Sequence, residues 1–96
     1  MEGQYSTALQ AASCAGVYRI VELLIQKGAD VNLAGGEHGT ALQAASYQGV
    51  YSIVRLLIEN GANVNLVGGQ YGTALQAATY VGKYEIVELL IEKGAD

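Results

Sequence analysis

The stretch GGEHGTALQAASYQGVYSIVRLLIENGANVNL (residues 35–66) decides the fold, because the rest of the chain nearly repeats it. The hexamer TALQAA begins at Thr7, Thr40 and Thr73, so both spacings (40 − 7 and 73 − 40) are 33 residues. Without a gap, residues 1–33 match residues 34–66 at 21 of 33 positions, and residues 67–96 match residues 34–63 at 20 of 30. Such a period is typical of a solenoid, whose units bury their apolar faces against each other. We therefore expect one array over residues 1–96, with repeats at 1–33, 34–66 and 67–96.

Each repeat predicts two helices joined by a short turn. TALQ is a capping-box pattern: the Thr side chain accepts a hydrogen bond from the backbone three residues on, and the Gln side chain reaches back. The alanines that follow favour a helix that neighbours can approach closely. A second helix then carries apolar residues at helical spacing. Glycines are placed to end the helices of the three copies: Gly16, Gly49 and Gly82 after the first, and Gly28, Gly61 and Gly94 after the second.

Two columns of the alignment carry further expectations. Tyr18, Tyr51 and Tyr84 are invariant and start the apolar stripe of the second helix, so we expect them to pack in the core. In a second column, the charge of the side chain alternates in sign from unit to unit. Packed helices lie roughly 8–10 Å apart, so its long side chains could meet across repeats. This column consists of Glu22, Arg55 and Glu88.

With these motifs, the chain resembles the ankyrin-repeat family. That family has a 33-residue unit of two helices and a β-turn. Its pattern runs GxTPLHxAAxxG, IVxxLL and GADVN, and this chain carries TALQAA, IVRLLI and GANVN. Two departures recur: Ala8, Ala41 and Ala74 replace the usual Pro, and Gln10, Gln43 and Gln76 replace the usual His. The resemblance implies an all-α fold, an ankyrin-repeat solenoid of three helix-turn-helix units with short β-turn or hairpin tips.

Composition restricts the partners. The net charge is −4 and only five residues are Lys or Arg, scattered along the chain. This argues against binding of nucleic acid or of an anionic membrane, because both need clustered basic residues. No apolar run approaches the roughly 20 residues of a membrane-spanning helix, and the start of the chain carries no signal-peptide pattern. With one cysteine and no internal disulfide, we expect a soluble cytoplasmic protein.

Nothing in the sequence predicts an enzyme, a metal or a cofactor. Cys14 is the only cysteine and His38 the only histidine, and no third group is placed to orient such a pair. A zinc site needs three or four convergent ligands, which the sequence does not offer. We therefore expect a protein that is not an enzyme, with no catalytic residues, no metal and no cofactor.

The residues that vary over the constant frame are the candidate binding residues. In the ankyrin family, tips and first helices line a concave face that binds partners, so the resemblance implies a partner-binding strip. Tyrosine suits recognition because it combines a large contact area with few rotatable bonds. The alternative is that these residues are ordinary exposed ones. The strip comprises Gln4, Tyr5, Glu37, His38, Tyr47, Gln48, Gln70, Tyr71, Tyr80 and Val81.

The first and last units raise a second hypothesis. Solenoids usually need terminal units with polar outer faces. Here the second helices at both ends, VYRIVELLI and KYEIVELLI, keep the internal apolar pattern. We therefore expect weak self-association into homo-oligomers through these uncapped ends. Two readings stay open: a module that binds an unidentified protein through the strip, and a designed or structural repeat scaffold that associates with itself.

Overall fold

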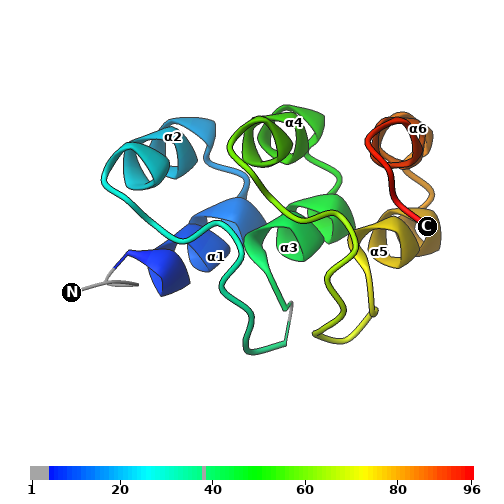
Figure 1. The fold of residues 1–96 in the computed structure, drawn as a ribbon, viewed down its shortest axis with the longest axis horizontal. Helices are drawn as coiled ribbons and strands as arrows, with labels where there is room; N and C mark the ends of the chain where they lie inside the picture. Colours follow the sequence, from blue (N-terminus) through cyan, green and yellow to red (C-terminus); the bar gives the residue numbers. More distant parts are fainter. Residues whose placement is uncertain (1–4, 38) are drawn as a thin grey trace.

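The computed structural model describes residues 5–37 and 39–96, and its helices form two layers. The inner layer consists of α1 (Ser6–Ala15), α3 (Ala41–Gln48) and α5 (Ala74–Val81). The outer layer consists of α2 (Tyr18–Gln26), α4 (Tyr51–Glu59) and α6 (Tyr84–Glu92). Each inner helix runs directly into the outer helix above it, and the first and last helix pairs lie at opposite ends of the long axis (Figure 1). The outer helices start at intervals of 33 residues (51 − 18 and 84 − 51), as the sequence period requires.

Two loops descend below the inner layer and connect successive units (Figure 1). We call residues 34–40 the first tip and residues 67–73 the second tip. Each tip closes with an isolated antiparallel bridge, Gly35 to Gly39 and Gly68 to Gly72. The described residues contain no β-strand beyond these single bridges. The predicted all-α solenoid with short hairpin tips is confirmed.

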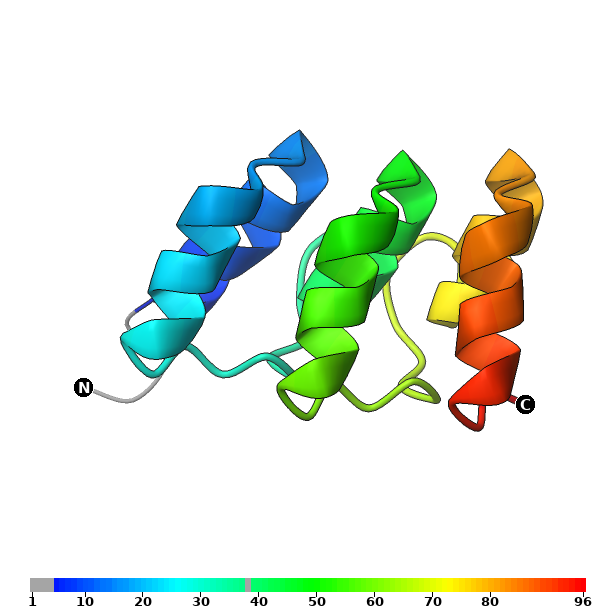
Figure 2. The same ribbon diagram turned by 90° about the horizontal axis from the view of Figure 1, so that it is seen from above.

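The core runs along the array and is built from small and medium side chains. Seen from above, the helices of each layer lie side by side (Figure 2). The inner helices can approach closely because they carry alanines: Ala41, Ala44 and Ala45 are at most 1% exposed. Between the layers, Ile53 and Leu57 of α4 are fully buried. Burying a side chain of this size contributes about 1.5–3 kcal/mol to folding. Among the described residues, the central unit has the largest share of the buried apolar side chains.

Glycines end the helices as predicted. Gly16, Gly49 and Gly82 follow the inner helices at φ of 78°, 78° and 74°. After α2, Gly28 has φ 92°, and the next amide, Ala29 N, donates to Leu24 O at 3.1 Å. Glycine adopts this left-handed backbone without a steric penalty.

The capping box is confirmed in two repeats and wrong in the first. Thr40 and Thr73 cap α3 and α5, each with the reciprocal bond from its glutamine. In the first repeat the helix begins two residues earlier than in the others, at Ser6, and Tyr5 caps it without a side-chain bond. The reason lies in the residue before the threonine. The later repeats have Gly39 and Gly72 there, at φ 78° and 84°, which the non-glycine Ser6 does not adopt.

The prediction that the tyrosines starting the outer helices pack in the core is wrong. Tyr18 and Tyr51 are each 38% exposed, and Tyr84 is 74% exposed. Each is the first residue of its helix. Helical side chains lean toward the N-terminus, so these rings have no preceding turn of their own helix to pack on. The buried stripe of the outer helix starts later, at Val21 in α2 and at Ile53 in α4.

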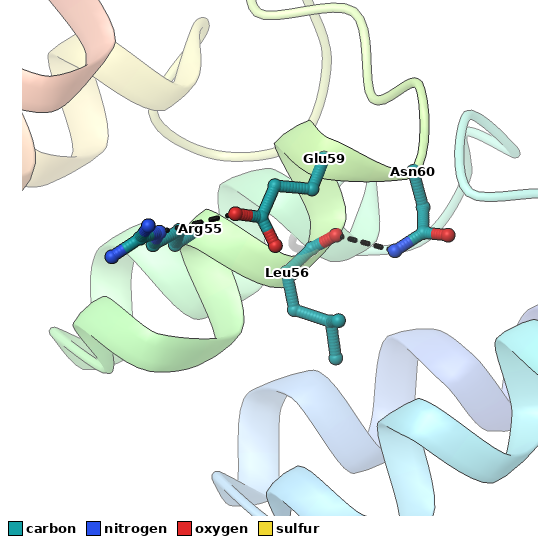
Figure 3. A network of polar contacts seen from close by, with 4 residues as sticks. All are labelled: Arg55, Leu56, Glu59 and Asn60. Atoms are coloured by element: carbon teal, nitrogen blue, oxygen red, sulfur yellow. Dashed lines mark hydrogen bonds and ion pairs between the residues drawn. The ribbon is translucent and has the colours of Figure 1, made fainter.

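The alternating charge column does not form its predicted contact. Arg55 Nε lies 3.1 Å from Glu59 Oε2, one turn along the same helix (Figure 3). Both side chains are more than half exposed, so the pair contributes only a few tenths of a kcal/mol. Asn60 ends α4 beside this pair, and its side chain donates to Leu56 O at 2.8 Å (Figure 3).

Candidate functional site

The inner surface, formed by the inner helices and the two tips, has a rigid backbone frame. Gly35 N donates to Gly39 O at 2.9 Å, and Gly68 N donates to Gly72 O at 3.0 Å. The tips are joined to each other where Gln70 N donates to Glu37 O at 2.7 Å. The two tips therefore lie side by side along the array.

Glutamines of the inner helices hold the tips. Gln10 Nε2 donates to Leu33 O at 2.9 Å and to Gly39 O at 2.7 Å. Gln43 repeats this on the second tip, donating to Leu66 O at 3.0 Å and to Gly72 O. Sequence reasoning gave these glutamines only the capping box and missed the bonds to the next repeat. The available signal was that glutamine is invariant in all three copies.

Asparagines form a second set of links between repeats. Asn32 Nδ2 donates to Gly61 O at 3.0 Å, and Asn32 Oδ1 accepts from Asn63 N at 2.7 Å. Asn65 makes the same two bonds one repeat later, with Gly94 O at 3.1 Å and Asp96 N at 3.0 Å. Sequence reasoning missed this ladder too, although the recurring VN dipeptide marks it. Together the two sets fix the register of neighbouring units.

Three tyrosines gather on this frame, and we call Tyr47, Tyr71 and Tyr80 the tyrosine cluster. Tyr47 and Tyr80 come from the last turns of α3 and α5, and Tyr71 from the second tip. The ring centroids of Tyr47 and Tyr71 are 4.6 Å apart with planes inclined by 12°, and those of Tyr71 and Tyr80 are 4.8 Å apart at 27°. Such stacked pairs contribute about 0.5–1.5 kcal/mol beyond the area they bury. The rings therefore form one preorganised aromatic surface.

The hydroxyl group of Tyr71 holds its proton more tightly than that of an isolated tyrosine. A side-chain hydrogen bond with Tyr47, followed by desolvation and by the nearby charges of Tyr47, Tyr80 and Glu37, raises the pKa of Tyr71 to about 12. This tyrosine therefore stays protonated and neutral throughout the physiological range.

The basic residues of the chain are confined to one of the two layers. All five basic residues lie on the outer helices or at their ends: Arg19, Lys27, Arg55, Lys83 and Lys93. The tips and the inner helices carry none of them. The first tip contributes one exposed carboxylate, that of Glu37. The inner surface is therefore aromatic and mildly acidic.

The first repeat has an open hollow where the second repeat has tyrosine. This first groove lies between α1 and the first tip. Cys14 occupies the position of Tyr47 there, and Gln48 Nε2 lies 3.6 Å from Cys14 Sγ. The groove is lined by Gln10, Ala11, Cys14, Ala15, Gly35, Gly36 and Glu37.

The residues of the predicted strip fall into three groups. Tyr47, Tyr71 and Tyr80 meet in the cluster, while Glu37 and Gln70 lie next to each other on the tips. The others are more scattered: Tyr5 caps α1, Val81 is half-buried at the end of α5, and Gln48 contacts Cys14. Gln4 and His38 lie outside the described residues. Partner binding by this strip stays a prediction.

Two other kinds of site are absent from residues 5–37 and 39–96. In this part of the chain, no group of three or more His, Cys, Asp or Glu side chains could hold a metal ion. Nor does any helix in it have the length and apolar character needed to cross a membrane.

Two comparisons with known proteins bear on this geometry. A family model described as ankyrin repeats (3 copies) matches residues 9–96. A comparison with curated proteins gave no match.

Proposed function

Because the chain belongs to the ankyrin-repeat family, we propose that it is a non-enzymatic module that binds a protein partner through its inner surface. Ankyrin repeats are generally protein–protein interaction modules. The matched region, residues 9–96, includes both tips and most of α1. The family supports the class of function, and the residues of this chain support the choice of surface.

The observation that carries the proposal is the tyrosine cluster. Three stacked rings stand on a frame of hydrogen bonds between repeats, and Tyr80 is 70% exposed. An exposed aromatic side chain on a rigid support loses little conformational freedom when a partner binds. Interface hot spots are enriched in tyrosine for the same reasons.

A comparison of two triple variants tests the proposal. The first, Tyr47→Ala with Tyr71→Ala and Tyr80→Ala, removes the cluster. The matched control, Tyr18→Ala with Tyr51→Ala and Tyr84→Ala, removes the same number of tyrosines from the outer helices. Both are used as baits beside the unchanged chain, after circular dichroism has confirmed that they are folded. We expect a partner that the unchanged chain and the control capture and that the cluster variant loses. Equal capture by all three baits would contradict the proposal.

A second candidate function, self-association, has its own observation. Ile20 of α2 is 48% exposed, whereas the equivalent Ile53 and Ile86 are 0% and 2% exposed because they pack against the preceding repeat. Leu23 is 50% exposed, whereas the equivalent Leu89 is 7% exposed. A second copy of the chain can bury this face by stacking as a further repeat does.

Light scattering after size exclusion tests self-association. We expect the mean mass to rise over about a hundredfold range of concentration, as mass action requires. Ile20→Glu should abolish the rise by placing a charge on the stacking face. A constant monomer mass over the whole range would contradict this candidate.

A further inference from the structure

We propose that the tyrosine cluster receives the guanidinium group of an arginine side chain on the partner. This rests on the proposed function and names the chemistry that the inner surface recognises. The occupant is a protein segment that displays arginine, and the ring of Tyr80 is its first contact.

The geometry of the rings suits a flat cation. Tyr47 and Tyr71 are nearly parallel at 12°, and Tyr80 is inclined to Tyr47 by only 19°. The three rings thus present similarly oriented faces. The face of an aromatic ring carries negative potential, and a cation within about 6 Å of its centroid is attracted to it. Arginine is planar, so it can lie flat on such a face.

The exposures leave a ring face available. Tyr80 is 70% exposed, so much of its surface is not covered by the other two rings. Tyr47 and Tyr71 are half-buried, and both stack on Tyr80. A partner side chain therefore meets a supported ring that is already in place.

The charges favour a cation over an anion. The chain has a net charge of −4, and its five basic residues all lie on the outer helices or at their ends. Glu37 accepts a backbone hydrogen bond from Gln70, the neighbour of Tyr71 in the second tip, and so brings a carboxylate to this surface. Arginine is preferred over lysine because the guanidinium group is more weakly hydrated than an ammonium group and stacks on aromatic faces.

The outer helices provide an internal control. A hollow there is lined by Tyr51, Tyr84, Leu89 and the carboxylates of Glu85, Glu88 and Glu92. It is more acidic than the tyrosine cluster. Tyr84, at 74% exposed, matches Tyr80 in exposure. Attraction by charge alone would direct a basic peptide to this outer hollow, and stacking would direct it to the cluster.

The test is a titration followed by the NMR signals of the tyrosine rings at physiological ionic strength. The probe is the peptide acetyl-Gly-Arg-Gly-Arg-Gly-Arg-Gly-amide. Two matched peptides carry lysine or citrulline in place of arginine, and citrulline has nearly the shape of arginine without its charge. We expect saturable shifts of the Tyr47, Tyr71 and Tyr80 signals. The lysine peptide should bind about threefold more weakly and the citrulline peptide about tenfold more weakly.

Variants of the exposed ring sharpen the test without endangering the fold. Tyr80→Phe keeps the ring face, so the Kd of the arginine peptide should change less than about twofold. Tyr80→Leu keeps an apolar side chain but loses the face, and the Kd should rise about fivefold. Tyr84→Leu should leave the Kd unchanged.

Three outcomes would overturn the inference: equal binding of the citrulline peptide, shifts confined to Tyr51 and Tyr84, or an unchanged Kd in the Tyr80→Leu variant. These outcomes are separable from failure of the proposed function. A partner lost only by the cluster variant, but insensitive to replacement of its own arginines, leaves the function intact and overturns the inference. Capture that does not depend on the cluster overturns the function, whatever the peptides do.

Discussion

The two tips of this protein have the same backbone but support different surfaces. Each closes with a glycine–glycine bridge, and each is held by a glutamine from the preceding inner helix, Gln10 or Gln43. Yet the first groove is open and lined by small residues, including Cys14, whereas Tyr47 and its neighbours fill the equivalent place on the second tip. The frame is therefore independent of the side chains displayed on it. This separation lets one repeat unit carry different recognition surfaces.

The largest expected effect comes from breaking the frame at the first tip. A Cβ on Gly39 would lie 1.9 Å from Gln43 Oε1, whereas a Cβ on Gly36 would meet nothing within 4 Å. Both glycines have positive φ, so the pair separates the clash from the cost of the left-handed backbone. Gly39→Ala should lower the free energy of unfolding by about 3 kcal/mol and Gly36→Ala by about 1 kcal/mol. A Cβ on Gly39 would also lie 2.9 Å from the backbone carbon of Gly68. Urea denaturation measures both losses, and equal losses would show that Gln43 and the second tip yield without cost.

The next effect divides the two roles of the glutamines. Within the part of the chain that the structure describes, Gln10 bonds only to its tip, Gln76 only within the capping box, and Gln43 makes both kinds of bond. Replacement by alanine should lower the free energy of unfolding by about 1–2 kcal/mol at Gln10, about 1 kcal/mol at Gln76 and about 2–3 kcal/mol at Gln43. Urea denaturation of the three variants checks whether the losses at Gln10 and Gln76 add up to the loss at Gln43. A loss at Gln43 no greater than at Gln76 would mean that the tip bonds contribute nothing.

A third change converts the first groove toward the second. Cys14→Tyr places a ring on α1 at the position that Tyr47 has on α3. The new ring would stand one repeat before Tyr47, just as Tyr47 stands one repeat before Tyr80. The equivalent pair of rings, Tyr47 and Tyr80, lies 6.5 Å apart. The added aromatic contact should raise the free energy of unfolding by about 0.5–1 kcal/mol. A double-mutant cycle with Tyr47→Leu measures the interaction energy between the rings at positions 14 and 47. A value of zero would mean that the two rings do not stack, although the backbones of the two repeats are alike.

The smallest effect is the titration of the cluster itself. The pKa of Tyr71 is raised to about 12, chiefly by its bond with Tyr47. Because the folded pKa lies above the ordinary value of about 10, the stabilisation is complete below pH 10 and is lost as the pH rises through 12. The difference in absorbance at the tyrosinate band between the unchanged chain and Tyr71→Phe should show a midpoint near pH 12. A midpoint near 10, with the helices intact by circular dichroism, would contradict the coupling.

Much of the fold followed from the period and the glycines. The number of units, the helix pair in each unit and the capping boxes at Thr40 and Thr73 were predicted correctly. The first box failed because Ser6 stands where the later copies have glycine. That difference was visible in the sequence, but its effect on the start of the helix depends on a backbone angle. The prediction that Tyr84 packs in the core failed for a related reason. Periodicity indicates which residues share the apolar face of the helix, but not which of them is the first to be buried.

The candidate site was predicted less completely. The strip included Tyr47, Tyr71 and Tyr80 because these positions vary between copies, but nothing in the sequence said that the three would stack. The glutamine and asparagine bonds were missed because each joins a side chain to a backbone group 23 to 31 residues away, at the end of the same unit or in the next one. Local pattern rules do not extend across that separation.

The sequence by itself determined the repeat, its helices and the turns between them, since these depend on contacts within a few residues and on the intrinsic preferences of glycine, alanine and threonine. Only the tertiary structure decided which side chains meet. Stacking the units at one register brings α3, the second tip and α5 together, so that Tyr47, Tyr71 and Tyr80 form one surface while Cys14 remains beside an open groove. Register is a property of the packed array, because no unit buries its apolar face alone.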